Sequence, residues 1–117
     1  MRLGVDAMGG DYAPEAVVLG AIEASEKVLP DTTLVLFGDK GRIEQLLKEN
    51  HASAKNIEIV HASQVIEMSD HPTQAFSQKT DSSIVVGFTH LKMGKIDGFA
   101  SAGSTGAMMV GCMHVIK

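Results

Sequence analysis

Short apolar runs alternate with longer amphipathic stretches along the chain. Each run is rich in aliphatic or β-branched residues and is bounded by glycine, proline or polar residues, which is typical of a strand. The runs predict strands at Arg2–Asp6, Thr33–Phe37, Ile57–His61 and Ile96–Ser101.

Apolar residues at helical spacing predict three helices, each between two consecutive predicted strands. Pro14 suits the first turn of one helix, Asp39 can cap the second, and Ser82 or Ser83 can cap the third, which ends near Gly94. The residues that share a face are Val18, Ile22, Ser25 and Leu29 before Pro30, then Ile43, Leu46 and Leu47, then Ile84, Phe88 and Leu91.

Two stretches depart from this pattern. Residues 64–80 are polar, carry Pro72 and have weak periodicity, so we expect a long connection with about one helical turn. Residues 107–117 are apolar on nearly every side, which predicts a helix buried on both sides. In that helix we expect Cys112 to be a small buried hydrophobe. We expect core packing from Met108, Met109 and Met113.

The order of elements predicts the fold class. Strands and helices alternate with short connections, which favours a Rossmann-like α/β fold with a parallel sheet and helices on both faces. Ligands collect beyond the carboxyl ends of the strands in such sheets. The glycine-rich segments AMGGD and SAGSTG both follow predicted strands, so we expect them on one rim.

Length and composition narrow the class of protein. A chain of 117 residues and 12.4 kDa, 44% hydrophobic and 21% charged, is expected to fold as one domain or part of one. The net charge of −4 without a basic block makes nucleic acid a poor partner. The single cysteine and the spacing of the five histidines predict no disulfide and no metal site.

The ends of the chain suggest a location and a larger protein. The start resembles no signal peptide and no run reaches membrane-spanning length, so we expect a cytoplasmic protein. The apolar segment 107–117 has no helix stop signal, so either the rest of a longer protein or a partner covers it. We favour the first and expect residues 1–117 to be the N-terminal part of a longer α/β domain, with the remainder of the cleft missing.

The segment Ser101–Gly106 follows a predicted strand and opens a helix. Its backbone N–H groups can converge on an anion, and the hydroxyls of Ser101, Ser104 and Thr105 can donate to it. We predict a phosphate site here, with Gly103 and Gly106 in the loop. The alternative is a tight turn in which Ser104 or Thr105 only caps the helix.

The first loop places Asp6 at a strand end and Asp11 near a helix start, with Gly9 and Gly10 letting the backbone approach a ligand. Alternatively, Asp11 is only a helix cap and Asp6 only a hydrogen-bond acceptor that braces the loop.

The segment QKTDSS brings Lys79, Asp81, Ser82 and Ser83 to a helix start. Lys79 could pair with a phosphate or thioester oxygen, or the segment could be a solvated loop with a cap. His61 and His71 are the best-placed histidines for a general base.

Taken in order, DAMGGD, QKTDSS and SAGSTGA closely resemble segments of the phosphate acyltransferases of bacterial phospholipid synthesis, the PlsX family. The resemblance runs nearly end to end, with VDAMGGDYAPEAVVLGA, IVHASQVIEMSDHPTQAF and KIDGFASAGSTGAMM as its markers. It implies that inorganic phosphate attacks the thioester of an acyl-acyl carrier protein and gives an acyl phosphate. It also implies a fold related to phosphotransacetylases, a homodimer and peripheral association with the inner face of the membrane, and it implies no cofactor.

The resemblance assigns roles residue by residue. The matching positions are Asp6, Gly9, Gly10 and Asp11; Lys79, Asp81, Ser82 and Ser83; and Ser101, Gly103, Thr105 and Gly106. We expect residues 103–106 to bind phosphate, Lys79 to offset its charge, and Asp6 with Asp11 to shape the loop that faces the thioester. Ser104 stands where many members have asparagine, and Ser77 where many have a basic residue, which lowers the positive charge near the site.

Two other functions fit the same scaffold. One is a catalytically incomplete module that binds an anion or a partner, which turnover measurements separate from an acyltransferase. The other is a nicotinamide-dependent enzyme, which the missing GxGxxG and the missing acidic residue downstream disfavour.

Overall fold

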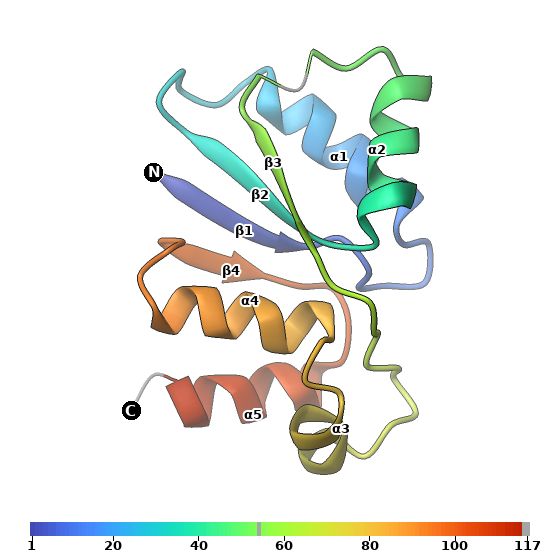
Figure 1. The fold of residues 1–117 in the computed structure, drawn as a ribbon, viewed down its shortest axis with the longest axis vertical. Coiled ribbons are helices and arrows are strands. Elements are labelled where there is room, and N and C mark those ends of the chain that lie inside the picture. The colour runs from blue at the N-terminus through green and yellow to red at the C-terminus, as the bar shows by residue number, and fades with distance from the viewer. Residues whose placement is uncertain (54, 116–117) are drawn as a thin grey trace.

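The computed structural model describes residues 1–53 and 55–115, which form a parallel sheet with helices against both faces (Figure 1). The strands lie in the order β3-β2-β1-β4, and every pair is parallel. The elements in chain order are β1 (Arg2–Asp6), α1 (Glu15–Ser25), β2 (Thr33–Gly38), α2 (Lys40–Glu49), β3 (Ile57–His61), α3 (Pro72–Gln78), α4 (Ser83–Lys92), β4 (Gly98–Ala100) and α5 (Thr105–Val115). The predicted α/β class is confirmed.

Strand β2 explains why the sheet needs helices on both sides. Leu34 and Leu36 point to one face and pack in the cluster formed by α1 and α2. Val35 and Phe37 point to the other face, where they pack with Ile96 and with residues of α4. Because successive side chains of a strand alternate between faces, an unbroken apolar run requires cover on both.

The predicted caps of α2 and α4 are confirmed. The Asp39 carboxylate accepts from the backbone N–H of Arg42, and the Ser82 hydroxyl accepts from that of Val85. Each side chain satisfies a backbone donor that has no partner inside its helix.

Helix α1 is shorter than predicted. It ends at Ser25, whose hydroxyl donates to the carbonyl of Ile22, and the chain then turns so that Leu29 is 71% exposed. Leu29 is therefore not part of the buried face, and the prediction that the helix continues to Pro30 is wrong. A serine that bonds the backbone one turn earlier competes with the helix, which favours an end here.

Helix α3 lies in the segment expected to be a connection with about one helical turn. Its seven residues begin at Pro72, and the Nδ1 atom of His71 accepts from the N–H of Gln74. The pattern did not reveal the full helix because Ala75 is its only buried residue among the described positions.

Helix α5 is buried on one side. Ala107 and Gly111 are buried, and Gly111 lies so close to the Phe88 ring of α4 that a Cβ atom would not fit. Met109 and Met113 are 62% and 68% exposed, and Cys112 is exposed. The prediction of a helix buried on both sides is therefore wrong for the described residues, since Ala107 and Gly111 lie on the buried side whereas Met109 and Met113 face outward. Met108 is half-buried and packs against the second core cluster.

Candidate functional site

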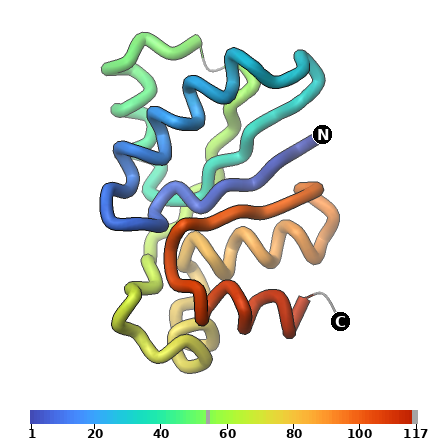
Figure 2. The backbone as a smooth tube through the Cα atoms, turned by 180° about the vertical axis from the view of Figure 1, so that it is seen from behind, coloured from blue at the N-terminus to red at the C-terminus, as the bar shows by residue number. Residues whose placement is uncertain are grey.

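The site lies where the connections of the sheet change direction. Strand β1 lies between β2 and β4, and the chain leaves β1 toward α1 but leaves β4 toward α5 (Figure 2). Helix α1 packs on one face of the sheet, whereas α5 packs on α4, which covers the other face. This divergence at the carboxyl ends of neighbouring strands creates the crevice in which doubly wound sheets bind ligands.

Asp6 and Ser101 join the two loops at this crevice. The buried Asp6 carboxylate accepts the Met8 N–H through Oδ1 at 2.9 Å and the Ser101 hydroxyl through Oδ2 at 2.7 Å. The Ser101 oxygen in turn accepts the N–H of Gly103 at 2.9 Å. Asp6 therefore braces the first loop as a hydrogen-bond acceptor, which was one of the two alternatives for this residue. It also fixes the position of the first loop against the second loop.

The two loops touch through backbone at Gly9 and Gly103. A Cβ atom at Gly9 would lie 2.7 Å from the Gly103 nitrogen and 2.8 Å from both Asp6 Oδ2 and Ser101 Oγ. The next residue, Gly10, has a φ of 100°, a conformation that side chains disfavour. The glycines therefore allow a contact that no larger residue could make, and the expectation that both glycine-rich segments share one rim is confirmed.

The second loop presents the start of α5. Ser104 is buried, and its hydroxyl accepts the Ala107 N–H at 3.2 Å, so it caps the helix. Thr105 is exposed at the first helical position. Gly106 packs against Pro72 of α3 with no room for a side chain, which gives it a packing role. Phosphate binding by this loop stays a prediction.

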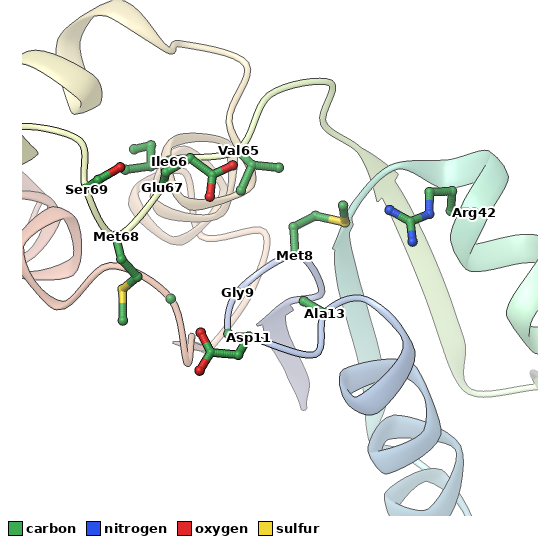
Figure 3. Close-up of a pocket in the computed structure, with 12 residues that line it drawn as sticks. Met8, Gly9, Asp11, Ala13, Arg42, Val65, Ile66, Glu67, Met68 and Ser69 are labelled. Atoms are coloured by element: carbon green, nitrogen blue, oxygen red, sulfur yellow. The ribbon is translucent and has the colours of Figure 1, made fainter.

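An open cleft of about 750 Å³ lies between the first loop and residues 65–69 (Figure 3). Gly9, Gly10 and Asp11 border it from one side, with Gly103 beside them. The full lining is Met8, Gly9, Gly10, Asp11, Ala13, Arg42, Val65, Ile66, Glu67, Met68, Ser69 and Gly103. The glycine loops thus open onto a space large enough for a small ligand.

Arg42 is the basic side chain at this cleft, and it was not among the site residues predicted from the sequence. It extends from the first turn of α2 and pairs with Glu15 at 2.9 Å, with both side chains about half exposed. The signal was available, because α2 begins at the carboxyl end of β2, on the rim where ligands collect. Residues 65–69 also follow a strand end on this rim and lie within the family marker IVHASQVIEMSDHPTQAF, but their weak periodicity gave no reason to place them at the cleft.

Lys79 lies behind the wall of the cleft formed by residues 65–69. Its ammonium donates to Asp70 Oδ2 at 2.7 Å and to the Val65 carbonyl at 2.8 Å. The hydrogen bond from Lys79 lowers the pKa of the Asp70 carboxyl below its ordinary value. Direct contact between Lys79 and a phosphate stays a prediction.

The other predicted site residues of the QKTDSS segment, Asp81, Ser82 and Ser83, also have structural roles. Asp81 accepts from both the N–H and the hydroxyl of Ser63, and these bonds lower the pKa of its carboxyl. Ser82 and Ser83 are buried at the start of α4. The structure therefore does not bring Asp81, Ser82 or Ser83 to the cleft lining.

The two candidate general bases each accept a backbone N–H from the first turn of a helix, His61 from the end of β3 and His71 as the cap of α3. His61 Nδ1 accepts from the N–H of Lys40, and His71 Nδ1 accepts from that of Gln74. Within residues 1–53 and 55–115, no three histidine, cysteine or acidic side chains gather closely enough to hold a metal ion. In the same part of the chain, no helix has the length and apolar character to cross a membrane.

Comparison with known proteins names the family of this doubly wound α/β protein. A family model described as fatty acid synthesis protein matches residues 1–117. The chain is 47% identical over 116 residues to a phosphate acyltransferase of Caldicellulosiruptor bescii, covering 99% of this chain and 34% of that protein. It is 41% identical over 117 residues to one of Lactococcus lactis, covering 100% of this chain and 34% of that protein.

A phosphate acyltransferase of Dictyoglomus turgidum is 48% identical over 109 residues, which are 93% of this chain and 32% of that protein. The chain therefore belongs to the fatty acid synthesis protein family. It spans about a third of the length of these curated relatives.

Proposed function

We propose that this chain contributes the phosphate-binding part of an acyltransferase that moves a fatty acyl group from acyl-acyl carrier protein to inorganic phosphate. The observation that carries the proposal is the contact between Gly9 and Gly103, held by Asp6 and Ser101 at the edge of an open cleft. Relatives named phosphate acyltransferase support the reaction class.

The chemistry needs positioning more than proton removal. Phosphate is already substantially dianionic at neutral pH, so one of its oxygens can attack the thioester carbonyl carbon directly. The tetrahedral intermediate then collapses as the carbon–sulfur bond breaks, and the carrier thiolate leaves and takes up the proton that the hydrogen phosphate carried. The products are an acyl phosphate and the free carrier thiol.

Backbone donors at the start of α5 suit this reaction. N–H groups at a helix start point toward an anion, and the helix dipole adds favourable potential. In our proposal residues 103–106 bind phosphate. The Ser101 hydroxyl lies before these residues in the loop, and the Thr105 hydroxyl lies at the start of α5. Arg42, across the cleft, adds positive charge. Asp6 holds the loops together, and Asp11 shapes the side that faces the thioester.

The proposal extends to partners and location. The substrates are an acyl-acyl carrier protein and inorganic phosphate, and the family resemblance adds a cytoplasmic homodimer that associates with the inner face of the membrane. A protein that uses a carrier-bound fatty acyl group and makes a phospholipid precursor would benefit from working at that surface.

Turnover tests the proposal. Palmitoyl-acyl carrier protein and phosphate are incubated with this chain and with any longer natural form, and hydroxylamine traps acyl phosphate as the hydroxamate. We expect phosphate-dependent product with the longer form, and its loss in the Gly103→Ala variant, with Gly20→Ala as a control because nothing lies within 4 Å of that site. Phosphate binding without product from either form would favour an anion-binding module instead.

A further inference from the structure

The connection between β3 and α3 forms one wall of the cleft, and it is held at both ends by the segment that follows α3. We call residues 63–70 the cleft wall. Of these, Val65 to Ser69 line the cleft. The side chain of Ile66 is 4% exposed and packs in the core cluster with Ile84 and Phe88 of α4. Because Ile66 is the one buried residue of the cleft wall, other contacts must hold the backbone on either side of it.

The first contact fixes the start of the wall. The Asp81 carboxylate accepts the N–H of Ser63 at 2.9 Å and also its hydroxyl. Gln64 and Asp81 exchange two further bonds, from Gln64 N–H to the Asp81 carbonyl and from Asp81 N–H to the Gln64 side chain. Gln64 also forms a parallel bridge with Ser82, which is fully buried. This end of the wall is therefore joined to α4.

The second contact fixes the end of the wall. Glu67 and Asp70 close a turn, in which the Asp70 carboxylate accepts the Glu67 N–H at 2.8 Å and the Asp70 N–H donates to the Glu67 carbonyl. The Lys79 ammonium reaches that same carboxylate and also the Val65 carbonyl. The Lys79 side chain thus links Val65, before the turn, to Asp70, at its end. Met68 and Ser69, which line the cleft, lie in this turn.

We infer that residues 79–82 act as a clasp that sets the position of the cleft wall, with Lys79 a positioning residue that acts through Asp70 and Val65. The inference rests on the proposed function, because the wall faces the loops that would bind phosphate. A charge-assisted bond to a carboxylate is stronger than a neutral one, and the side chains of Lys79 and Asp70 are each only about one third exposed, so the pair is partly shielded from water. Moving Lys79 onto a phosphate would leave the Asp70 carboxylate unpaired beside an incoming anion.

Amide hydrogen exchange of the protein without substrate tests the clasp directly. Lys79→Met removes the ammonium but keeps the length of the side chain. We expect the Glu67 and Asp70 amides to exchange about tenfold faster in this variant, because local opening of the turn becomes easier. The matched control, Lys27→Met, breaks an exposed pair with Glu23 on α1 and should leave these amides unchanged. Unchanged exchange at Glu67 and Asp70 in Lys79→Met would overturn the inference.

Phosphate titration separates a clasp from a direct ligand. For a clasp, Lys79→Met and Asp70→Asn each weaken phosphate binding by about three- to tenfold, and the double variant is no worse than the weaker-binding single one, because the pair acts as a unit. For a direct ligand, Asp70→Asn frees the ammonium and keeps or improves binding while Lys79→Met loses it. The second result overturns the inference.

A conservative variant and an activity assay complete the test. Lys79→Arg retains the charge and should restore slow exchange at Glu67 and at least half of the phosphate affinity lost in Lys79→Met. In an active form, the clasp variants should raise KM for phosphate more than they lower kcat, since the reacting groups stay in place. Because exchange is measured without substrate, failure of the acyltransferase proposal leaves the clasp result standing.

Discussion

At the scale of single residues, the contact between the loops after β1 and β4 depends on groups far apart in the chain. Asp6 and Ser101 are separated by 95 positions, yet their side chains lie 2.7 Å apart. Gly9 adds the space that brings backbone to backbone. From the sequence, Asp6 could equally have been only a hydrogen-bond acceptor within its own loop, and its contact with Ser101 follows from β1 and β4 being neighbours in the sheet.

Replacing Gly9 tests whether this contact is required. In Gly9→Ala the new methyl group would press on the Gly103 nitrogen and on the buried Asp6–Ser101 pair, none of which can move cheaply. We expect the free energy of unfolding to fall by about 1–3 kcal/mol and phosphate binding to be lost, as measured by urea denaturation and titration. Gly20→Ala is the control, because a Cβ atom at this position of α1 would meet nothing within 4 Å. It should leave the free energy of unfolding unchanged or raise it by up to about 1 kcal/mol. Equal stability of the two variants would contradict the account.

Replacing Arg42 tests the charge of the cleft. Its pair with Glu15 is about half exposed, so Arg42→Gln should change the free energy of unfolding by less than about 1 kcal/mol. Phosphate binding should weaken about three- to tenfold, because a positive charge across the cleft is lost. Glu15→Gln removes the carboxylate that pairs with Arg42 and leaves Arg42 charged. This variant should therefore bind phosphate at least as well as the original chain. Titration of both variants at low salt makes the comparison.

At the scale of elements, the strands and two capped helices could be predicted because each has a local cause. The run of β2 is buried on both faces, and Asp39 and Ser82 each cap a helix. Helix α5 could not be predicted correctly, because apolar residues occupy all its sides and only the contacts with α3 and α4 decide which side is buried. Helix α3 was underestimated because it buries little.

The two sides of α5 should respond differently to substitution in this chain. Met113→Gln changes a side chain that is 68% exposed, so we expect less than about 0.5 kcal/mol of change in the free energy of unfolding. Gly111→Ala places a methyl group against the Phe88 ring and should cost about 1–3 kcal/mol. Thermal or urea unfolding measures both, and a larger loss for Met113→Gln would show that the exposed side is wrongly assigned.

At the scale of the whole molecule, alternation of strands and helices predicted the rim on which the site lies. It could not predict that β1 and β4 would be neighbours, which places the crevice between their loops. Nor could it reveal that residues 65–69 would form the opposite wall, because that connection is held by contacts with Lys79 and Asp81 rather than by a periodic pattern.

Acid should destabilise the folded chain through carboxylates that bridge distant segments. The Arg2 guanidinium of β1 makes two hydrogen bonds to Glu58 of β3 and lowers the pKa of that carboxyl below its ordinary value of 4.5. The pair therefore stabilises the fold above pH 4.5, and this contribution is lost as pH falls through the lowered value. Glu58→Gln should be slightly less stable near pH 7 and equal to the original chain at the lowest pH. Urea midpoints between pH 3 and 7 measure the difference, and parallel curves would refute it.

We expect phosphate to bind where the loops after β1 and β4 meet. A titration of the isotope-labelled chain with inorganic phosphate, followed through its backbone amide NMR signals, tests this most directly. We expect saturable shifts concentrated at residues 9–11 and 103–106, with the remainder of the sheet unchanged and the shifts absent in Gly9→Ala. Shifts that are absent from these loops, or that concentrate elsewhere while the chain is folded, would contradict this expectation.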